Sequence, residues 1–424
     1  MPHKPSPSIT RLILASLLGA TLLTANAGDT PAVDAKIKDW FALAKTERVA
    51  VIGIGDSNQR FGGHGYSHYM PQALYKVFGC YGSGLSLYRQ WKEKGEPEPP
   101  SAPEELASRL LSYWYIPAGQ SASVSWKNGL LIVPADHPLD VKGNLRFHMK
   151  YGVFTGEAGN FKPTIRRDSV PWTVIESAAE RIVPVGQTQK LASTTLDVPA
   201  DAERDFPLQF MPSPVNTPIE GAFLAASASC ENTDKQAGLS YQTLYAVGGQ
   251  SLADMLGTFR EQGPEKLGEY FAEIRNQLNG HKTCIVIIQS GLNDRNERQP
   301  SAGPAAGQDS STGAGYADNL QGIMDVLQNA WTKAGGEVGS LFFVFMPSHT
   351  VSDPDDSRLL SYRQATRELA ATLPNAGVIN LEQLVPYQKM VDDKLFDGGR
   401  QTDSHLDRKG YETISQAIAD KLQE

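Results

Sequence analysis

The stretch VAVIGIGDSNQRFGG, residues 49–63, joins two kinds of sequence. Val49 to Ile54 is an apolar, mostly β-branched run, which is typical of a strand buried on both faces of a parallel sheet. A small polar turn, Gly-Asp-Ser-Asn, follows at once and leads into a glycine-rich loop. Open α/β sheets bind their ligands at the carboxyl ends of the strands. The stretch therefore predicts an α/β fold with Ser57 placed for chemistry, although a serine after a strand is also a common helix N-cap.

Strand and helix patterns alternate again from about residue 239 to the end of the chain. Apolar runs typical of buried strands are followed by segments with apolar residues at helical spacing. This alternation predicts a parallel sheet that helices cover on both faces. The expected strands are 240–247, 283–290, 340–348 and 377–381, and the expected helices are 68–77, 248–259, 317–333, 357–373 and 408–422.

Residues 116–235 have a different pattern. Short runs of alternating apolar and polar residues, such as LRFHMKYGVF and STTLDV, are separated by turn residues. This pattern predicts an antiparallel β-sandwich or jelly roll, inserted into a loop of the α/β domain. The expected organisation is a signal peptide (1–27), the first part of the α/β domain (28–115), the insert (116–235) and the second part of the domain (236–424).

The first 27 residues have the layout of a secretory signal peptide. Lys4 and Arg11 precede an apolar stretch over 12–23, and Ala-Asn-Ala at 25–27 is a small-x-small cleavage site. We expect cleavage near Ala27 and a periplasmic or secreted protein, with an uncleaved anchor as the alternative. No later run is long and apolar enough to predict a second membrane span.

Composition argues against nucleic acid as a partner. The chain of 424 residues has a formal net charge of −8 and no basic cluster. Its hydrophobic content of 40% is enough for a large core, so a folded protein of two or three domains is expected. The oligomeric state is left open.

Cysteines and histidines do not indicate a disulfide framework or a metal site. Cys284 lies in an apolar run and is expected to be a buried free thiol, which leaves Cys80 and Cys230 as the pair that would form any bridge. His64 and His68 are four residues apart, but no third ligand is identifiable, so no metal is expected. They are interpreted as pocket-lining or packing residues.

Four polar stretches stand after expected strands or before the last helix: 55–58, 248–251, 291–294 and 403–405. Each one alone is also consistent with a turn, a helix cap or a surface histidine. Together they contain the parts that nucleophilic catalysis requires. The assigned roles are Ser57 as nucleophile, His405 as general base, Asp403 as the carboxylate that orients it, and the N–H groups of Ser57 and Gly249 with the Asn293 amide as oxyanion donors.

At these residues the chain resembles the SGNH, or GDSL-like, hydrolase family. The Gly-Asp-Ser turn ending at Ser57 matches the family's nucleophile block, and Gly249 and Asn293 match its oxyanion glycine and its Gly-x-Asn-Asp asparagine. Asp403 and His405 match the last block, and all four blocks occur in the family's order. The resemblance implies a flavodoxin-like three-layer α/β fold and a serine esterase that needs no cofactor.

The last block departs from the family's usual Asp-x-x-His. Thr402 occupies the position three before His405, and Asp403 lies only two before it. Asp403 is our assignment for the carboxylate. Asp397 is the second candidate, and a Ser-His dyad without a carboxylate is a third interpretation.

A β-sandwich inserted between the first two blocks resembles the architecture of peptidoglycan O-acetylesterases and other carbohydrate esterases, in which the insert is similar to a carbohydrate-binding module. The expected function is therefore removal of O-acetyl groups from a polysaccharide or peptidoglycan. An O-acetyltransferase, a lipase or thioesterase, and a catalytically dead carbohydrate-binding protein are the alternatives. The aromatic residues that would stack on sugars, or else fill the core of the insert, are Trp126, Phe147, Tyr151, Phe154, Phe161 and Trp172.

Overall fold

The structure is a computed structural model, and it describes most of the chain after residue 30. The expected signal peptide and Asp403 lie outside the described residues. So do His64 and three of the aromatic candidates, Trp126, Phe161 and Trp172. The described residues are 31–59, 65–85, 112–121, 130–133, 138–156, 164–167, 173–177, 192–205, 208–211, 218–295, 307–400 and 404–424.

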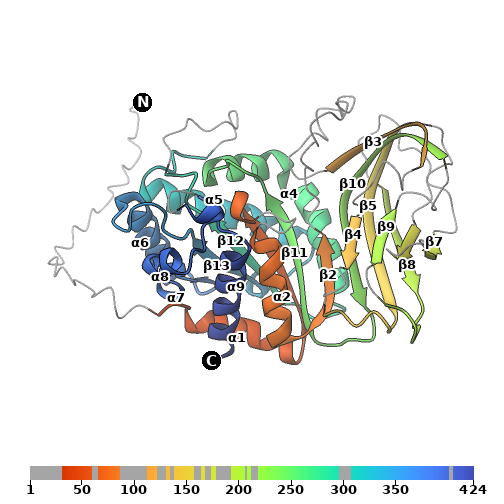
Figure 1. Ribbon diagram of the computed structural model, residues 1–424, viewed down its shortest axis with the longest axis horizontal. Coiled ribbons are helices and arrows are strands. Elements are labelled where there is room, and N and C mark those ends of the chain that lie inside the picture. The colour runs from red at the N-terminus through yellow and green to blue at the C-terminus, as the bar shows by residue number, and fades with distance from the viewer. Residues whose placement is uncertain are drawn as a thin grey trace, which may run out of the picture. The chain divides into compact units, whose positions relative to one another are not determined.

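Parallel strands form one side of the main sheet, up to its edge at β14, in the spatial order β11-β1-β12-β13-β14. Three of them, β11, β12 and β13, are labelled in Figure 1. Counted along the chain, this order is 2-1-3-4-5, which is the flavodoxin-like order. The predicted α/β class and strand arrangement are therefore confirmed. The bounds are β1 Arg48–Gly55, β11 Gly238–Ala246, β12 Cys284–Ser290, β13 Leu341–Pro347 and β14 Ala376–Val378.

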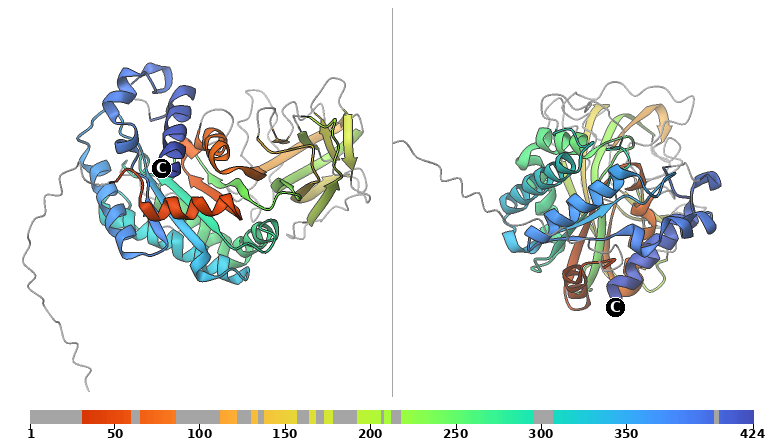
Figure 2. Two further views of the ribbon diagram at one scale, coloured as in Figure 1. Left: turned by 90° about the horizontal axis from the view of Figure 1, so that it is seen from below. Right: turned by 90° about the vertical axis from the view of Figure 1, so that its left-hand side faces the viewer.

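Helices cover both faces of this sheet, as the alternating pattern predicts. Helices α2 and α9 pack on one another, as do α4 and α5, and Figure 2 shows the two pairs on opposite sides of the strands. The bounds are α1 Ala35–Ala42, α2 Tyr66–Phe78, α4 Leu252–Gln277, α5 Gly313–Lys333, α6 Ser357–Thr372, α7 Leu381–Leu384, α8 Tyr387–Asp392 and α9 Arg408–Gln423, with 3-10 turns η1 Leu43–Lys45, η2 Ser57–Gln59, η3 Val338–Ser340 and η4 Asp397–Gly399.

Antiparallel strands between Ser112 and Asn232 form the insert. One set continues the main sheet, because β2 pairs with β11 in parallel and with β10 antiparallel, and β10 in turn pairs with β3 and β5. A second sheet has the order β4-β9-β6-β7. The antiparallel character predicted for the insert is confirmed. The bounds are β2 Cys80–Leu85, β3 Ser112–Ser121, β4 Leu130–Val133, β5 Leu145–Gly156, β6 Thr164–Arg167, β7 Thr173–Ser177, β8 Ala192–Val198, β9 Leu208–Met211 and β10 Pro218–Asn232.

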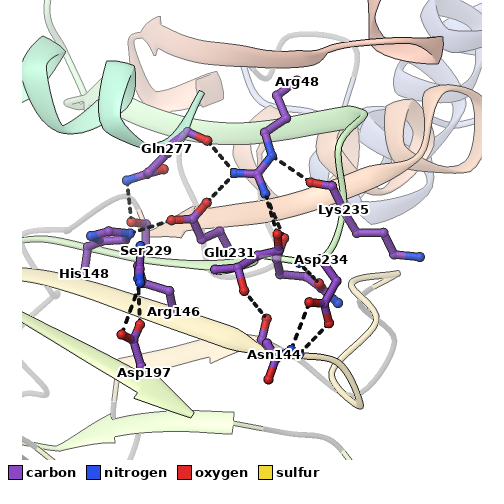
Figure 3. A network of polar contacts seen from close by, with 12 residues as sticks. Arg48, Asn144, Arg146, His148, Asp197, Ser229, Glu231, Asp234, Lys235 and Gln277 are labelled. Atoms are coloured by element: carbon purple, nitrogen blue, oxygen red, sulfur yellow. Dashed lines mark hydrogen bonds and ion pairs between the residues drawn. The ribbon is translucent and has the colours of Figure 1, made fainter. Parts of the chain in front are cut away.

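A buried ion pair joins β1 to the insert (Figure 3). Arg48, the first residue of β1, lies 2.6 Å from Glu231 near the end of β10, and both side chains are almost fully buried. The guanidinium also donates to the backbone oxygens of Gln277 (2.7 Å) and Lys235 (2.8 Å). The second Glu231 oxygen lies 2.9 Å from Nε2 of His148 on β5. One carboxylate thus connects the parallel and antiparallel strands.

All three cysteines are buried free thiols. The expectation for Cys284 is confirmed, and the structure does not contain the bridge considered between Cys80 and Cys230. Phe147, the one aromatic candidate of the insert whose side chain is described, is buried in the core. Its role is therefore packing, which was the alternative to sugar stacking.

Within the described part of the chain, no helix has the length and apolar character needed to cross a membrane. The same residues contain no cluster of three or more His, Cys, Asp or Glu side chains arranged to hold a metal ion.

We expect the Glu231→Ala variant to lose about 3–5 kcal/mol of unfolding free energy, because it leaves the buried Arg48 charge without its partner. The matched control is Asp197→Ala. Asp197 forms an ion pair of the same 2.6 Å length with Arg146 on the same part of the insert, but both side chains are well exposed. That variant should lose about 1 kcal/mol or less. Urea unfolding measures both losses, and similar losses would contradict the importance given to the buried pair.

Candidate functional site

Ser57 lies at the carboxyl end of the central strand. β1 ends at Gly55, and Ser57 is the first residue of the 3-10 turn η2. Its side chain is mostly buried, and no described residue donates a hydrogen bond to its hydroxyl or accepts one from it. The next helix begins only at Tyr66 and has Gly65 as its N-cap. The helix-cap interpretation of Ser57 is therefore wrong, and the hydroxyl is available for chemistry.

Asp56 holds the turn from inside. One carboxylate oxygen accepts from the backbone N–H of Asn58 at 2.8 Å and from its side-chain amide at 3.2 Å. The other accepts from the side-chain amide of Asn293 at 3.3 Å. Asn293 follows β12, the parallel neighbour of β1. The first and third predicted stretches therefore meet where the chain reverses its direction of strand addition, the usual ligand-binding position in such sheets.

The second stretch joins the same place through Asn293, whose side-chain amide also donates to the backbone oxygen of Gln250 at 3.1 Å. Gly249 precedes it with φ +75°, a backbone conformation that favours glycine. A Cβ at Gly249 would meet no atom within 4 Å, so the backbone here borders open space. This geometry suits a donor that must approach a bound ligand. Both amide hydrogens of Asn293 are engaged, and the contact to Asp56 is the longer one.

Helix α9, which follows the last predicted stretch, contacts the Ser57 turn. The Tyr411 hydroxyl donates to Oδ1 of Asn58 at 2.8 Å, which links this helix directly to the Ser57 turn. His405 is half-buried in the segment just before α9, and its backbone oxygen accepts from the N–H of Asp397 at 3.1 Å. The structure therefore brings parts of three predicted stretches together and joins to them the helix that follows the fourth. Asp403 is not among the described residues.

Asp397, the second candidate for the carboxylate, is exposed. The contact that the structure gives between Asp397 and His405 is the backbone one. His68, the described member of the histidine pair, lies on α2 with its ring edge-on to Tyr69 at 4.6 Å. A packing role fits this position.

Sequence reasoning missed one buried titratable group in this region, His349, and gave no catalytic role to another, Asp294, the last residue of the predicted stretch 291–294. His349 follows β13 at the same edge of the sheet, and burial, with the electrostatic effect of the nearby Arg363 and His405 side chains, lowers its pKa to about 3. Asp294 accepts from the backbone N–H of Leu252 at 2.8 Å. Burial raises the pKa of Asp294 to about 7, against the opposing effect of a hydrogen bond from Ser310. The rule that ligands bind at carboxyl strand ends would have directed attention to His349 as well.

No family model and no curated protein matches the chain. Among solved structures, the chain is similar to a Corynascus thermopiles (Myceliophthora fergusii) carbohydrate esterase family 2 enzyme with a carbohydrate-binding domain, at 12% identity, over 73% of this chain and 98% of that chain, with a TM-score of 0.26. The acetyl xylan esterase Est2A of Butyrivibrio proteoclasticus matches at 8% identity, over 69% and 94%, with a TM-score of 0.25. A family two carbohydrate esterase of Clostridium thermocellum, in complex with cellohexaose, matches at 8% identity, over 73% and 97%, with a TM-score of 0.25. TM-scores of this size do not establish a common fold.

The raised pKa of Asp294 predicts a pH-dependent stability. Because its pKa of about 7 in the folded state lies above the usual value of 3.8, the folded state binds this proton more tightly. The contribution is fully present below about pH 4 and is lost as the pH rises through about 7, by an amount on the order of a few kcal/mol. Asp294→Asn keeps an oxygen for the Leu252 N–H but does not titrate. The stability of this variant relative to wild type should therefore rise between pH 4 and 7, as measured by urea unfolding, whereas parallel curves would contradict the shift.

Proposed function

We propose that the chain is a serine esterase that removes O-acetyl groups from an extracytoplasmic polysaccharide or peptidoglycan. One observation carries the proposal. A chain of hydrogen bonds runs from Gln250 through Asn293, Asp56 and Asn58 to Tyr411, and so ties three of the four predicted stretches and the helix after the fourth around the Ser57 turn. Nucleophilic catalysis requires a hydroxyl, a base and fixed donors close together, and this network supports such an arrangement around Ser57.

In the proposed reaction, Oγ of Ser57 attacks the ester carbonyl while His405 accepts its proton. A C–O bond forms, and the carbonyl electron pair moves onto oxygen. Asp403 holds the His405 imidazole in the required tautomer and orientation. The N–H groups of Ser57 and Gly249 and the Asn293 amide donate to the oxyanion. The C–O bond to the sugar then breaks, and His405 returns the proton to the sugar oxygen.

Water completes the cycle. His405 takes a proton from the water as it attacks the acetyl-enzyme, and Ser57 leaves with that proton while acetate is released. None of these steps needs a cofactor. For Asn293 to donate to the oxyanion, its amide must first give up one of the two hydrogen bonds that it now makes, to Asp56 or to Gln250. The contact to Asp56, at 3.3 Å, is the weaker of its two bonds and is the one we assign to this exchange.

The polymeric substrate and its location are proposed from the insert and from the first 27 residues. The antiparallel strands of the insert adjoin the α/β sheet, and there they would hold a chain of sugars remote from the bond that is broken. The signal-peptide pattern supports a substrate outside the cytoplasm. An acetylated polymer of the cell envelope fits both features.

We expect Ser57→Ala to lower hydrolysis of a chromogenic acetyl ester by about 10³-fold or more, because the oxyanion donors alone cannot replace a nucleophile. His405→Ala should be about as damaging, and the double variant little worse, since the two residues act as a unit. The measurement is kcat with unfolding curves as a control for folding. Near-normal turnover by Ser57→Ala would exclude this mechanism.

The same assay separates the two carboxylate candidates. Asp403→Ala should lower kcat, though less than the loss of His405 does, and Asp397→Ala should leave it unchanged, because the Asp397 carboxylate is exposed. The reverse result would assign the role to Asp397. Release of free acetate without a sugar acceptor distinguishes the esterase from a transferase.

Asn293→Ala should lower kcat by about 10²–10³-fold with little change in KM, because the amide donates to charge that develops only in the transition state. Asn293→Asp should lower stability as well, since it sets a second carboxylate where the amide now lies 3.3 Å from Asp56. Steady-state kinetics and urea unfolding test the pair. A change confined to KM would remove Asn293 from the oxyanion hole.

A further inference from the structure

Gln59 closes the turn that carries Ser57. It is the last residue of η2, two positions after Ser57, and its side chain is completely buried. The side chain lies against Gly53 and Gly55 of β1. A long polar side chain is rarely buried in this way unless its hydrogen-bonding groups are used.

The side-chain amide of Gln59 connects the turn to two other elements. Nε2 donates to the hydroxyl of Tyr241 on β11 at 2.8 Å and to Oγ of Ser67 in the first turn of α2 at 3.0 Å. The Ser67 hydroxyl donates to the backbone oxygen of Gln59 and lies 2.6 Å from Oγ1 of Thr243. Both the side chain and the main chain of Gln59 are therefore held by β11 and α2.

Strand β1 is shaped to accept this side chain. A Cβ at Gly53 would lie 2.4 Å from Nε2 of Gln59, and one at Gly55 would lie 2.7 Å from its Cβ. No real side chain fits at such distances. The two glycines of the GIG sequence thus leave the space in which Gln59 folds back over the strand.

Stability alone does not explain a glutamine here. Its Oε1 atom is buried and has no hydrogen-bond partner among the described residues. A buried unpaired oxygen costs about 1–3 kcal/mol, a cost that an apolar side chain of the same length avoids. The role of the amide therefore lies in the two hydrogen bonds that Nε2 donates to Tyr241 and Ser67.

We propose that Gln59 is a positioning residue for Ser57, fixing the far end of the turn so that Oγ keeps its direction toward the bound ester. The inference rests on the proposed function. Asp56 holds the near end of the same turn through Asn58. A displacement of about 1 Å at a reacting atom costs on the order of 10²-fold in rate. If the turn were held at one end only, Oγ of Ser57 could be displaced by that much and would attack the ester more slowly.

The first test replaces the amide and keeps the shape. Gln59→Met should lower kcat for an acetyl ester by about 10–100-fold and leave KM nearly unchanged. The matched control is Gln277→Met. Gln277 is equally buried and donates to a serine oxygen, that of Ser229, at 2.8 Å, but it lies beside Arg48 at the opposite end of β1. That variant should lose stability without losing kcat.

The second test uses pH. In Gln59→Glu, burial favours the neutral carboxylic acid, which can donate to Tyr241, over the carboxylate, which cannot. The ratio of variant to wild-type kcat should be highest at low pH and fall as the pH rises. Using the ratio removes the titration of His405, which both proteins share.

Wild-type kcat in Gln59→Met, or a pH-independent ratio in Gln59→Glu, would overturn the inference. Equal losses of kcat in Gln59→Met and Gln277→Met would do the same, because they would show a general effect of core damage. These outcomes are distinct from failure of the proposed function. That failure would appear as retained activity in Ser57→Ala, whatever Gln59 does.

Discussion

The buried guanidinium of Arg48 determines how the parallel and antiparallel strands meet. It is the first residue of the central strand, and it contacts Glu231 of the insert and the last turn of α4 at the oxygen of Gln277. A cation at the carboxyl end of a helix also interacts favourably with the negative end of the helix dipole. A buried charge is tolerated only when it is paired and hydrogen-bonded, so β1, β10 and α4 must all be in place for Arg48 to be stable.

The opposite end of β1 carries the candidate site, and its organisation depends on polar contacts in the same way. Asp56 accepts hydrogen bonds from inside its own turn and from the neighbouring strand end. Tyr411 connects the turn to the last helix, and Gln59 connects it to β11 and α2. The apolar residues of β1 between the two ends are fully buried, so the strand itself is a rigid support. The site is therefore carried by a buried strand whose following turn is hydrogen-bonded at both ends.

Much of this arrangement could be predicted because short local sequence patterns determine the strands, the helices and the turns between them. Apolar β-branched runs and helical spacing identify the parallel strands and their helices, and polar turns after the strands indicate Ser57, Gly249 and Asn293 as candidate site residues. The Arg48–Glu231 pair could not be predicted, because its partners are 183 positions apart and neither lies in a motif. Gln59 resembles any polar loop residue until its fold-back over β1 is seen. The roles of Asp403 and of the insert stay predictions.

The continuity of the main sheet also constrains the order in which the protein acquires its structure. β1 hydrogen-bonds to β11, and Arg48 contacts Lys235 at a separation of 187 positions, with the whole insert between them. Contacts of such separation are slow to form, since the entropy of closing a long loop is lost before any contact compensates for it. As the chain emerges from a ribosome or a translocation pore, β1 remains without either parallel neighbour until the insert has been delivered. The central strand is therefore made first but paired only after the antiparallel strands of the insert have been made.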